Sequence, residues 1–163
     1  MNTFHCSTFT TPLGDFTIAC NERAEIVATA FGNRSVLQTR LGPARLVAGD
    51  DVCAASRAAV LAYFAGARRK FSLPLAATGS VFQHRVWAAL REIPFGETRS
   101  YGALARELDS SPRAVGRGNA TNPICLIVPC HRVIGTDGSL TGFAFGEELK
   151  RRLLEHEGAF ARS

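Results

Sequence analysis

The stretch YGALARELDSSPRAVGRGNA, residues 101–120, decides the fold of the second half of the chain. It predicts two short helices, at about residues 101–108 and 112–120, joined by a turn at residues 109–111. Ser111 suits the N-cap of the second helix, and Pro112 suits its first turn, where a backbone N–H has no intrahelical partner to lose. Two short helices with a tight turn form a candidate helix-turn-helix, but the same arrangement also occurs as plain packing in proteins that bind no DNA.

A longer amphipathic helix precedes this pair. Ser80 and Gln83 fit a capping box at its start, and the segment at residues 94–96, Pro-Phe-Gly, ends it. Apolar residues recur along one face at helical spacing. They are Phe82, Val86, Leu90 and Ile93, with Trp87 beside them as a core residue.

An unbroken apolar run, Ile-Cys-Leu-Ile-Val at residues 124–128, follows the helix pair. Proline flanks it on both sides, and we expect a short buried strand that leads the chain to Cys130. Two further elements complete this half. They are a tight turn at Asp137-Gly138 between Val133-Ile134 and Leu140-Thr141, and a final helix at 147–157 that Gly158 ends.

The first half of the chain has a different pattern. Residues 3–10, 15–20 and 25–31 are rich in Thr, Phe, Ile and Val, and they predict an antiparallel meander. A helix should follow, with Asp50 or Asp51 as its N-cap and Gly66 at its end. Small residues after Pro74 indicate a linker, so we expect an α+β protein with an N-terminal α/β domain at 1–76 and a mostly helical domain at 80–163.

Composition limits the class of protein. A chain of 163 residues with 46% hydrophobic content can bury a core in one domain or two small ones. It has no apolar run of 18 residues and its first residues lack the pattern of a secretory signal, so we expect a cytoplasmic protein. The formal net charge of +5 suggests a polyanionic partner. Residues 110–136 hold Arg113, Arg117 and Arg132 with no Asp or Glu.

The five cysteines form an odd set with no C-x-x-C pair. This argues against a disulfide framework and against the common zinc spacings. We expect free thiols, most of them small buried hydrophobic residues, and no metal. The five are Cys6, Cys20, Cys53, Cys125 and Cys130.

Cys130 stands in the segment Pro-Cys-His-Arg-Val, residues 129–133. A thiol beside an imidazole and a guanidinium can be held partly as thiolate, which makes Cys130 a candidate nucleophile. Neighbours in a regular strand point to opposite faces, so contact with His131 requires that Pro129 break the strand or that water bridge the two groups. A buried thiol with an adjacent surface His131 and Arg132 is the alternative.

A resemblance that covers residues 80–158 favours the nucleophile. Asn122-Pro123, the PCHRV segment and His156-Glu157-Gly158 resemble the active-site signature of the O6-alkylguanine-DNA alkyltransferases. Further agreement comes from Phe82-Gln83 with Val86-Trp87, from Phe95-Gly96 and Tyr101, from residues 113–116, and from Lys150 before Leu153-Leu154.

The resemblance implies a ribonuclease H-like N-terminal domain and a winged helix-turn-helix C-terminal domain that holds the site. It implies one irreversible transfer of an alkyl group from O6-alkylguanine, or O4-alkylthymine, in DNA to Cys130, with no cofactor. His131 resembles the base that acts through water, and Glu157 the carboxylate that orients the imidazole. Asn122 resembles the residue whose amide braces the active-site turn.

The partner implied is double-stranded DNA that carries O6-alkylguanine, bound by a monomer, with cooperative binding of several copies left open. The target atom lies inside a base pair, so the nucleotide must be flipped out. Arg113 resembles the finger that fills the vacated stack, and Tyr101 the aromatic residue that turns the target phosphate. Other expected DNA contacts are Ser100, Ala114, Gly116 and Arg117. The second helix of the pair, residues 112–120, should approach the minor groove closely because several of its residues are small. They are Ala114, Gly116, Gly118 and Ala120.

The expected substrate pocket departs from the family pattern. Where relatives carry Tyr-x-Gly-Gly, this chain has Phe143-Ala144-Phe145-Gly146, so a hydroxyl is missing and a ring replaces a glycine. The full expected pocket is Val133, Phe143, Ala144, Phe145 and Lys150. The zinc site of some relatives is not supported either, because Cys6 and Cys20 lack suitably spaced histidines.

Two other functions stay open at this point. An alkyltransferase-like protein that binds DNA lesions without chemistry would carry another residue at the position of Cys130. A cysteine hydrolase that uses Cys130 and His131 would need an oxyanion hole and a turnover step, and the sequence indicates neither.

Overall fold

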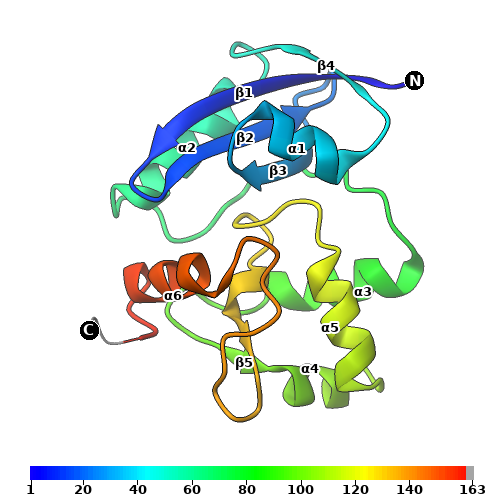
Figure 1. Cartoon of the computed structure of the whole chain (residues 1–163), viewed down its shortest axis with the longest axis vertical. Helices are drawn as coiled ribbons and strands as arrows, with labels where there is room; N and C mark the ends of the chain where they lie inside the picture. The colour runs from blue at the N-terminus through cyan, green and yellow to red at the C-terminus, as the bar shows by residue number, and fades with distance from the viewer. Residues whose placement is uncertain (161–163) are drawn as a thin grey trace. The chain divides into compact units, whose positions relative to one another are not determined.

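The computed structural model of the protein describes residues 1–160. Its contacts divide the chain between Thr78 and Gly79 into two compact units (Figure 1). One unit is a sheet with two helices and the other is mostly helical, which confirms the α+β prediction. Residues 161–163 of the expected C-terminal domain lie outside the described part of the chain.

The N-terminal unit is built on a four-stranded sheet with the order β3-β2-β1-β4. Strands β1 (Thr3–Thr11), β2 (Gly14–Cys20) and β3 (Ile26–Phe31) form the predicted antiparallel meander. Strand β4 (Arg45–Ala48) lies parallel to β1 and was not predicted, because four residues carry too short a pattern. Every residue of β3 is buried, so this strand belongs to the core of the unit.

Two helices contact this sheet (Figure 1). Helix α1 (Arg34–Leu41) was not predicted, since Leu37 is its one buried residue and no apolar face is visible in its sequence. Helix α2 (Ala54–Phe64) begins after Cys53, which makes no side-chain cap. The prediction of Asp50 or Asp51 as the N-cap was wrong, because Asp50 accepts a hydrogen bond from Ser7 of β1 instead.

The C-terminal unit contains the predicted helices. Ser80 and Gln83 form a capping box at the start of the first one, and Trp87 is a core residue whose Nε1 donates to the carbonyl of Gly118. Ser111 caps the second helix of the helix-turn-helix, with Pro112 in its first turn. The helices are α3 (Val81–Arg91), α4 (Tyr101–Glu107), α5 (Pro112–Ala120) and α6 (Glu147–His156).

A two-stranded parallel sheet joins distant parts of this unit. Strands β5 (Arg99–Ser100) and β6 (Val133–Ile134) pair with each other. The turn at Asp137-Gly138 forms, with the N–H of Gly138 donating to the carbonyl of Gly135 at 2.8 Å. Residues 140–141 beyond this turn form no strand, and β6 has its partner in β5.

The apolar run at residues 124–128 is a buried turn, so the prediction of a strand was wrong. Leu126 has a positive φ of 72°, and the N–H of Val128 donates to the carbonyl of Ile124 at 2.9 Å. The run is buried as expected, but an unbroken apolar sequence has no period that distinguishes a strand from a compact turn.

No disulfide bond joins any of the five cysteines, and all five are buried. Among residues 1–160, no group of three or more His, Cys, Asp or Glu side chains is arranged to hold a metal ion. No helix in this part of the chain is both long enough and apolar enough to span a bilayer.

Candidate functional site

The segment around Cys130 is a single turn of 3-10 helix, Cys130–Arg132, with Pro129 at its N-cap. The chain turns here, so neighbouring side chains do not alternate between two faces as they would in a strand. Cys130, His131 and Arg132 are 5%, 0% and 6% exposed. This burial excludes the interpretation in which His131 and Arg132 are surface residues beside an unreactive thiol.

Glu157, at the C-cap of α6, holds both neighbours of Cys130. Its Oε2 lies 2.8 Å from Nε2 of His131. Arg132 donates from Nε to Oε1 at 2.8 Å and from Nη2 to Oε2 at 2.9 Å. The third guanidinium nitrogen, Nη1, donates to the carbonyl of Ile93 at 2.7 Å. One buried carboxylate therefore orients an imidazole and a guanidinium together.

The charges of this network determine which nitrogen of His131 carries a proton. Burial alone would raise the pKa of Glu157, but the hydrogen bonds from His131 and Arg132 and the charge of Arg132 outweigh it and lower that pKa well below its usual range. Burial lowers the pKa of His131 despite the opposing effect of Glu157. A neutral imidazole must then donate from Nε2 to the ionised Glu157.

Nδ1 of His131 is consequently an acceptor with a free lone pair. It is buried and has no hydrogen-bond partner among the described residues. A neutral imidazole whose second nitrogen is held by a carboxylate is the arrangement of a general base.

Arg132 acts at a different place from the one the sequence suggested. We expected its guanidinium to hold the thiol as thiolate, but all three of its nitrogens bind Glu157 and Ile93. The ring of Phe95 covers it, 5.9 Å from ring centroid to the guanidinium carbon. Arg132 therefore orients the carboxylate and leaves the sulfur to other groups.

Asn122 spans the buried turn that leads to Cys130. Its Nδ2 donates to the carbonyl of Val128 at 2.9 Å, and its Oδ1 accepts from the N–H of Ile124 at 3.0 Å. The side chain of Asn122 therefore bridges the two ends of this turn.

Two polar side chains lie within electrostatic reach of Cys130. Lys150 is fully buried, and its Nζ donates to the carbonyl of Thr141 at 3.2 Å. Burial lowers the pKa of Lys150 to about 8, against the opposing effect of Cys130 and Glu147. Burial raises the pKa of Tyr101, the hydrogen bond from Asn119 lowers it, and the charge of Cys130 raises it.

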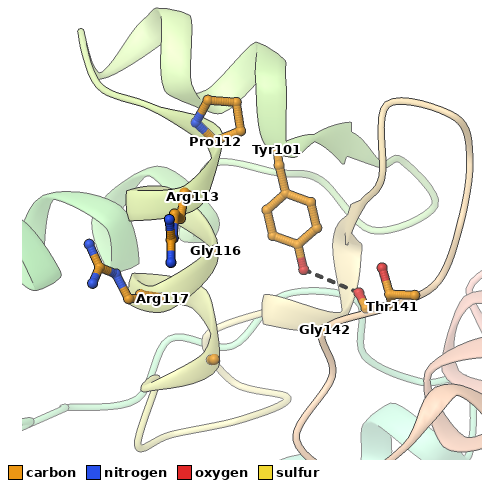
Figure 2. A pocket seen from close by; sticks show the side chains of 8 residues that line it. Tyr101, Pro112, Arg113, Gly116, Arg117, Thr141 and Gly142 are labelled. Carbon is orange, nitrogen blue, oxygen red and sulfur yellow. Dashed lines mark hydrogen bonds between the residues drawn. The ribbon is translucent and has the colours of Figure 1, made fainter.

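A cavity of about 460 Å³ opens beside Tyr101 (Figure 2). The Tyr101 ring stands between α5 and the loop at residues 141–142, and its hydroxyl donates to the carbonyl of Thr141 at 3.3 Å. Arg113 and Arg117 project from α5. The lining residues are Tyr101, Pro112, Arg113, Gly116, Arg117, Ala120, Thr141 and Gly142.

The other expected DNA contacts lie on or near α5. Arg113 and Arg117 are exposed, and Ala114 is half-buried. Ser100 caps α4 by accepting from the N–H of Ala103. Gly118 was expected to keep the DNA-facing side slim, and this was wrong: it is buried, and a Cβ there would lie 2.9 Å from Val86, so its small size allows α5 to pack on α3.

The expected pocket residues around position 143 lie outside the lining of this cavity. Val133 and Phe143 are buried, Ala144 is exposed and Phe145 is half-buried. The rings of Phe143 and Phe145 meet edge to face with centroids 5.7 Å apart. The two phenylalanines therefore contact each other at the positions where the resemblance implied a tyrosine and a glycine.

Sequence reasoning missed Asn119. Its Nδ2 donates to the carbonyl of Cys130 at 3.3 Å and to the hydroxyl of Tyr101 at 3.4 Å. Its position in the sequence could have indicated burial. Asn119 follows the fully buried Val115 by four residues, so both lie on the inner face of α5.

Comparisons with known proteins agree with this architecture. The family model for the DNA binding domain of 6-O-methylguanine DNA methyltransferase matches residues 81–159, and the model for its ribonuclease-like domain matches residues 4–77. A methylated-DNA--protein-cysteine methyltransferase of Methanosarcina acetivorans is 39% identical over 153 residues, covering 93% of this chain and 96% of the relative. One from Mycobacterium tuberculosis is 43% identical over 157 residues, covering 94% and 92%.

Solved structures show the same fold. The Mycobacterium tuberculosis O6-methylguanine methyltransferase has a TM-score of 0.81 at 37% identity, covering 98% of this chain and 96% of that one. Mycobacterium tuberculosis OGT in complex with DNA has a TM-score of 0.82 at 38% identity, covering 95% and 93%. With both domains matched in order and nearly the whole chain aligned, this protein belongs to the 6-O-methylguanine DNA methyltransferase family.

Proposed function

We propose that this chain repairs DNA directly, by moving the alkyl group from O6 of an alkylated guanine, or O4 of an alkylated thymine, to the sulfur of Cys130. The observation that carries the proposal is the buried His131 beside Cys130, neutral, with Nε2 held by Glu157 and Nδ1 unpaired among the described residues. The names of the relatives favour transfer over lesion binding without chemistry.

The first step is loss of the thiol proton. Nδ1 of His131 takes it through a bridging water, and the ionised Glu157 stabilises the imidazolium that forms. Arg132 holds the carboxylate in place. Lys150, whose charge interacts with that of Cys130, favours the thiolate further.

The second step is displacement at the alkyl carbon. A carbon–sulfur bond forms, the carbon–oxygen bond breaks, and its electron pair stays with the guanine oxygen, while a proton from the site returns the base to neutral guanine. This chemistry uses only side chains of this chain and the bridging water. A thioether has no easy route back to a thiol, so each molecule acts once.

The DNA must deliver a flipped nucleotide, because the O6 atom lies inside the base pair. The exposed Arg113 at the start of α5 is suited to fill the vacated stack. The cavity beside Tyr101 has the size of a small-molecule site and is suited to receive the nucleotide (Figure 2). Ser100, Ala114, Gly116 and Arg117 then contact the DNA of the same complex, which one monomer forms.

Intact-mass measurement tests the proposal. After incubation with duplex DNA that contains O6-methylguanine, the protein should gain about 14 Da, because a methyl group replaces the thiol hydrogen, and peptide mapping should place the change on Cys130. Cys130→Ser should gain no mass yet keep its affinity for DNA, since a serine hydroxyl is a far weaker nucleophile. Cys125→Ala, which removes a buried thiol of the same unit, should still be methylated. A wild-type protein that binds the duplex without gaining mass would be a lesion-binding protein instead.

A further inference from the structure

Asn119 connects three parts of the site. It is 2% exposed and lies in the last turn of α5. Its single amide nitrogen donates to the backbone carbonyl of Cys130 at 3.3 Å and to the hydroxyl of Tyr101 at 3.4 Å.

The direction of these hydrogen bonds follows from the groups themselves. A carbonyl can only accept, so the NH₂ group of Asn119 and not its oxygen must face Cys130. The second hydrogen of the same NH₂ reaches the Tyr101 oxygen, which leaves the phenol proton to donate to the carbonyl of Thr141 at 3.3 Å. The Cys130 carbonyl also accepts from the N–H of Val133, so both of its lone pairs are used.

The amide oxygen of Asn119 adds a second observation. It is buried and has no hydrogen-bond partner among the described residues. A buried polar atom without a partner destabilises the fold, and a side chain chosen only for stability at this place would be apolar. The NH₂ contacts to Cys130 and Tyr101 are therefore the feature that accounts for an asparagine here.

We infer that Asn119 is a positioning residue for alkyl transfer, which ties the peptide of Cys130 and the hydroxyl of Tyr101 to the helix that meets DNA. The inference rests on the proposed function. Docking of α5 on the duplex then positions Cys130 and the Tyr101 phenol together, because one amide group donates to the Cys130 carbonyl and to the Tyr101 hydroxyl. Small displacements of reacting groups have large effects on rate, so this connection acts on the transfer step rather than on DNA affinity.

Asn119→Leu tests the inference, because leucine has a similar size and keeps the site filled while it removes both hydrogen bonds. The rate constant for transfer at saturating duplex should fall by about tenfold to a hundredfold. Affinity for the same duplex, measured in the Cys130→Ser background, should stay within about twofold of its parent. Equal loss of affinity and rate would show a merely structural role and overturn the inference.

A double-mutant cycle with Tyr101→Phe separates a connected pair from two independent residues. If Asn119 acts partly through the Tyr101 hydroxyl, the double variant should be faster than the product of the two single effects predicts. Multiplicative effects would overturn the connection. Should Asn119→Leu fail to fold in a thermal melt, Asn119→Ala, which introduces no bulk, takes its place in the cycle with the same expectations.

Thr121→Val is the matched control at the same end of α5. Its hydroxyl bonds to the carbonyls of Arg117 and Gly118 and accepts from Gln83, away from the Cys130 carbonyl. Its transfer rate constant should equal that of the wild type. If the wild type transfers no alkyl group, the proposed function fails; if it transfers and Asn119→Leu is as fast, only this inference fails.

Discussion

Replacing Glu157 with glutamine is the sharpest test of the site, because it keeps the shape of the side chain and removes its charge. The carboxylate accepts hydrogen bonds from Nε2 of His131 and from two nitrogens of Arg132. Glutamine has one oxygen and one NH₂ group. Whichever way the amide is turned, its NH₂ must face a donor, from His131 or from Arg132, and the charge of Arg132 loses its buried partner.

The magnitudes follow from this geometry. Breaking a buried ion pair by removing one partner costs about 3–5 kcal/mol, and in a chain of this size each kcal/mol lowers the melting temperature by roughly 2–4 °C. Glu157 also raises the pKa of His131 against the effect of burial, so its loss lowers that pKa further and makes Nδ1 a weaker base. A positioned base contributes about 10²–10⁴ in rate, and we expect transfer to slow by at least about a hundredfold.

Single-turnover transfer to the protein from an O6-methylguanine duplex gives the rate, and a thermal melt gives the stability. Glu148→Gln is the matched control on the same helix, because Glu148 pairs with Arg151 at the exposed surface, where such pairs contribute little. It should leave both quantities nearly unchanged. A Glu157→Gln protein that transfers within about threefold of the wild-type rate would refute the role of the carboxylate in tuning the base.

Further predictions concern stability at low pH, repair of duplex DNA and the size of the substrate pocket. The folded pKa of His131 is lowered from 6.5 and that of Glu157 from 4.5, so the unfolded state takes up protons first as the pH falls; stability measured by melts should drop below about pH 6.5 and again below about pH 4.5. Arg113→Ala should slow repair of duplex DNA far more than transfer from the free modified base, since only the duplex has a stack to fill; equal slowing would place its role elsewhere. Phe143 and Phe145 pack on each other outside the lining of the cavity beside Tyr101. If the O6 substituent extends to this pair, Phe145→Gly should raise the rate with O6-benzylguanine selectively, by about tenfold to a hundredfold, and Phe143→Tyr should raise the methyl and benzyl rates alike. A wild-type protein equally fast with benzylguanine and methylguanine would show that Phe145 points away from the substrate.

Local chemistry made most of the C-terminal helices predictable. The capping box at Ser80 and the Ser111-Pro112 start of α5 both form as the sequence indicates, because a helix start depends on side chains within one turn. Strand β4 and helix α1 depend on partners elsewhere in the chain, and their own residues carry little periodicity. The buried turn at 124–128 belongs to the same class, since Asn122 and not the apolar run determines its shape.

The resemblance names the residues of the candidate site, but it does not predict how they contact one another. Cys130, His131 and Glu157 follow from the resemblance, whereas the target of the Arg132 guanidinium depends on where α6 places its C-cap, 25 residues further along the chain. That placement has a chemical consequence. Because Arg132 and His131 both donate to one carboxylate, Glu157 stays ionised even when buried, and His131 must keep its proton on Nε2. The base that we propose is therefore oriented through a guanidinium that does not touch the thiol, and substitutions of Arg132 should act on Cys130 through the tautomer of His131.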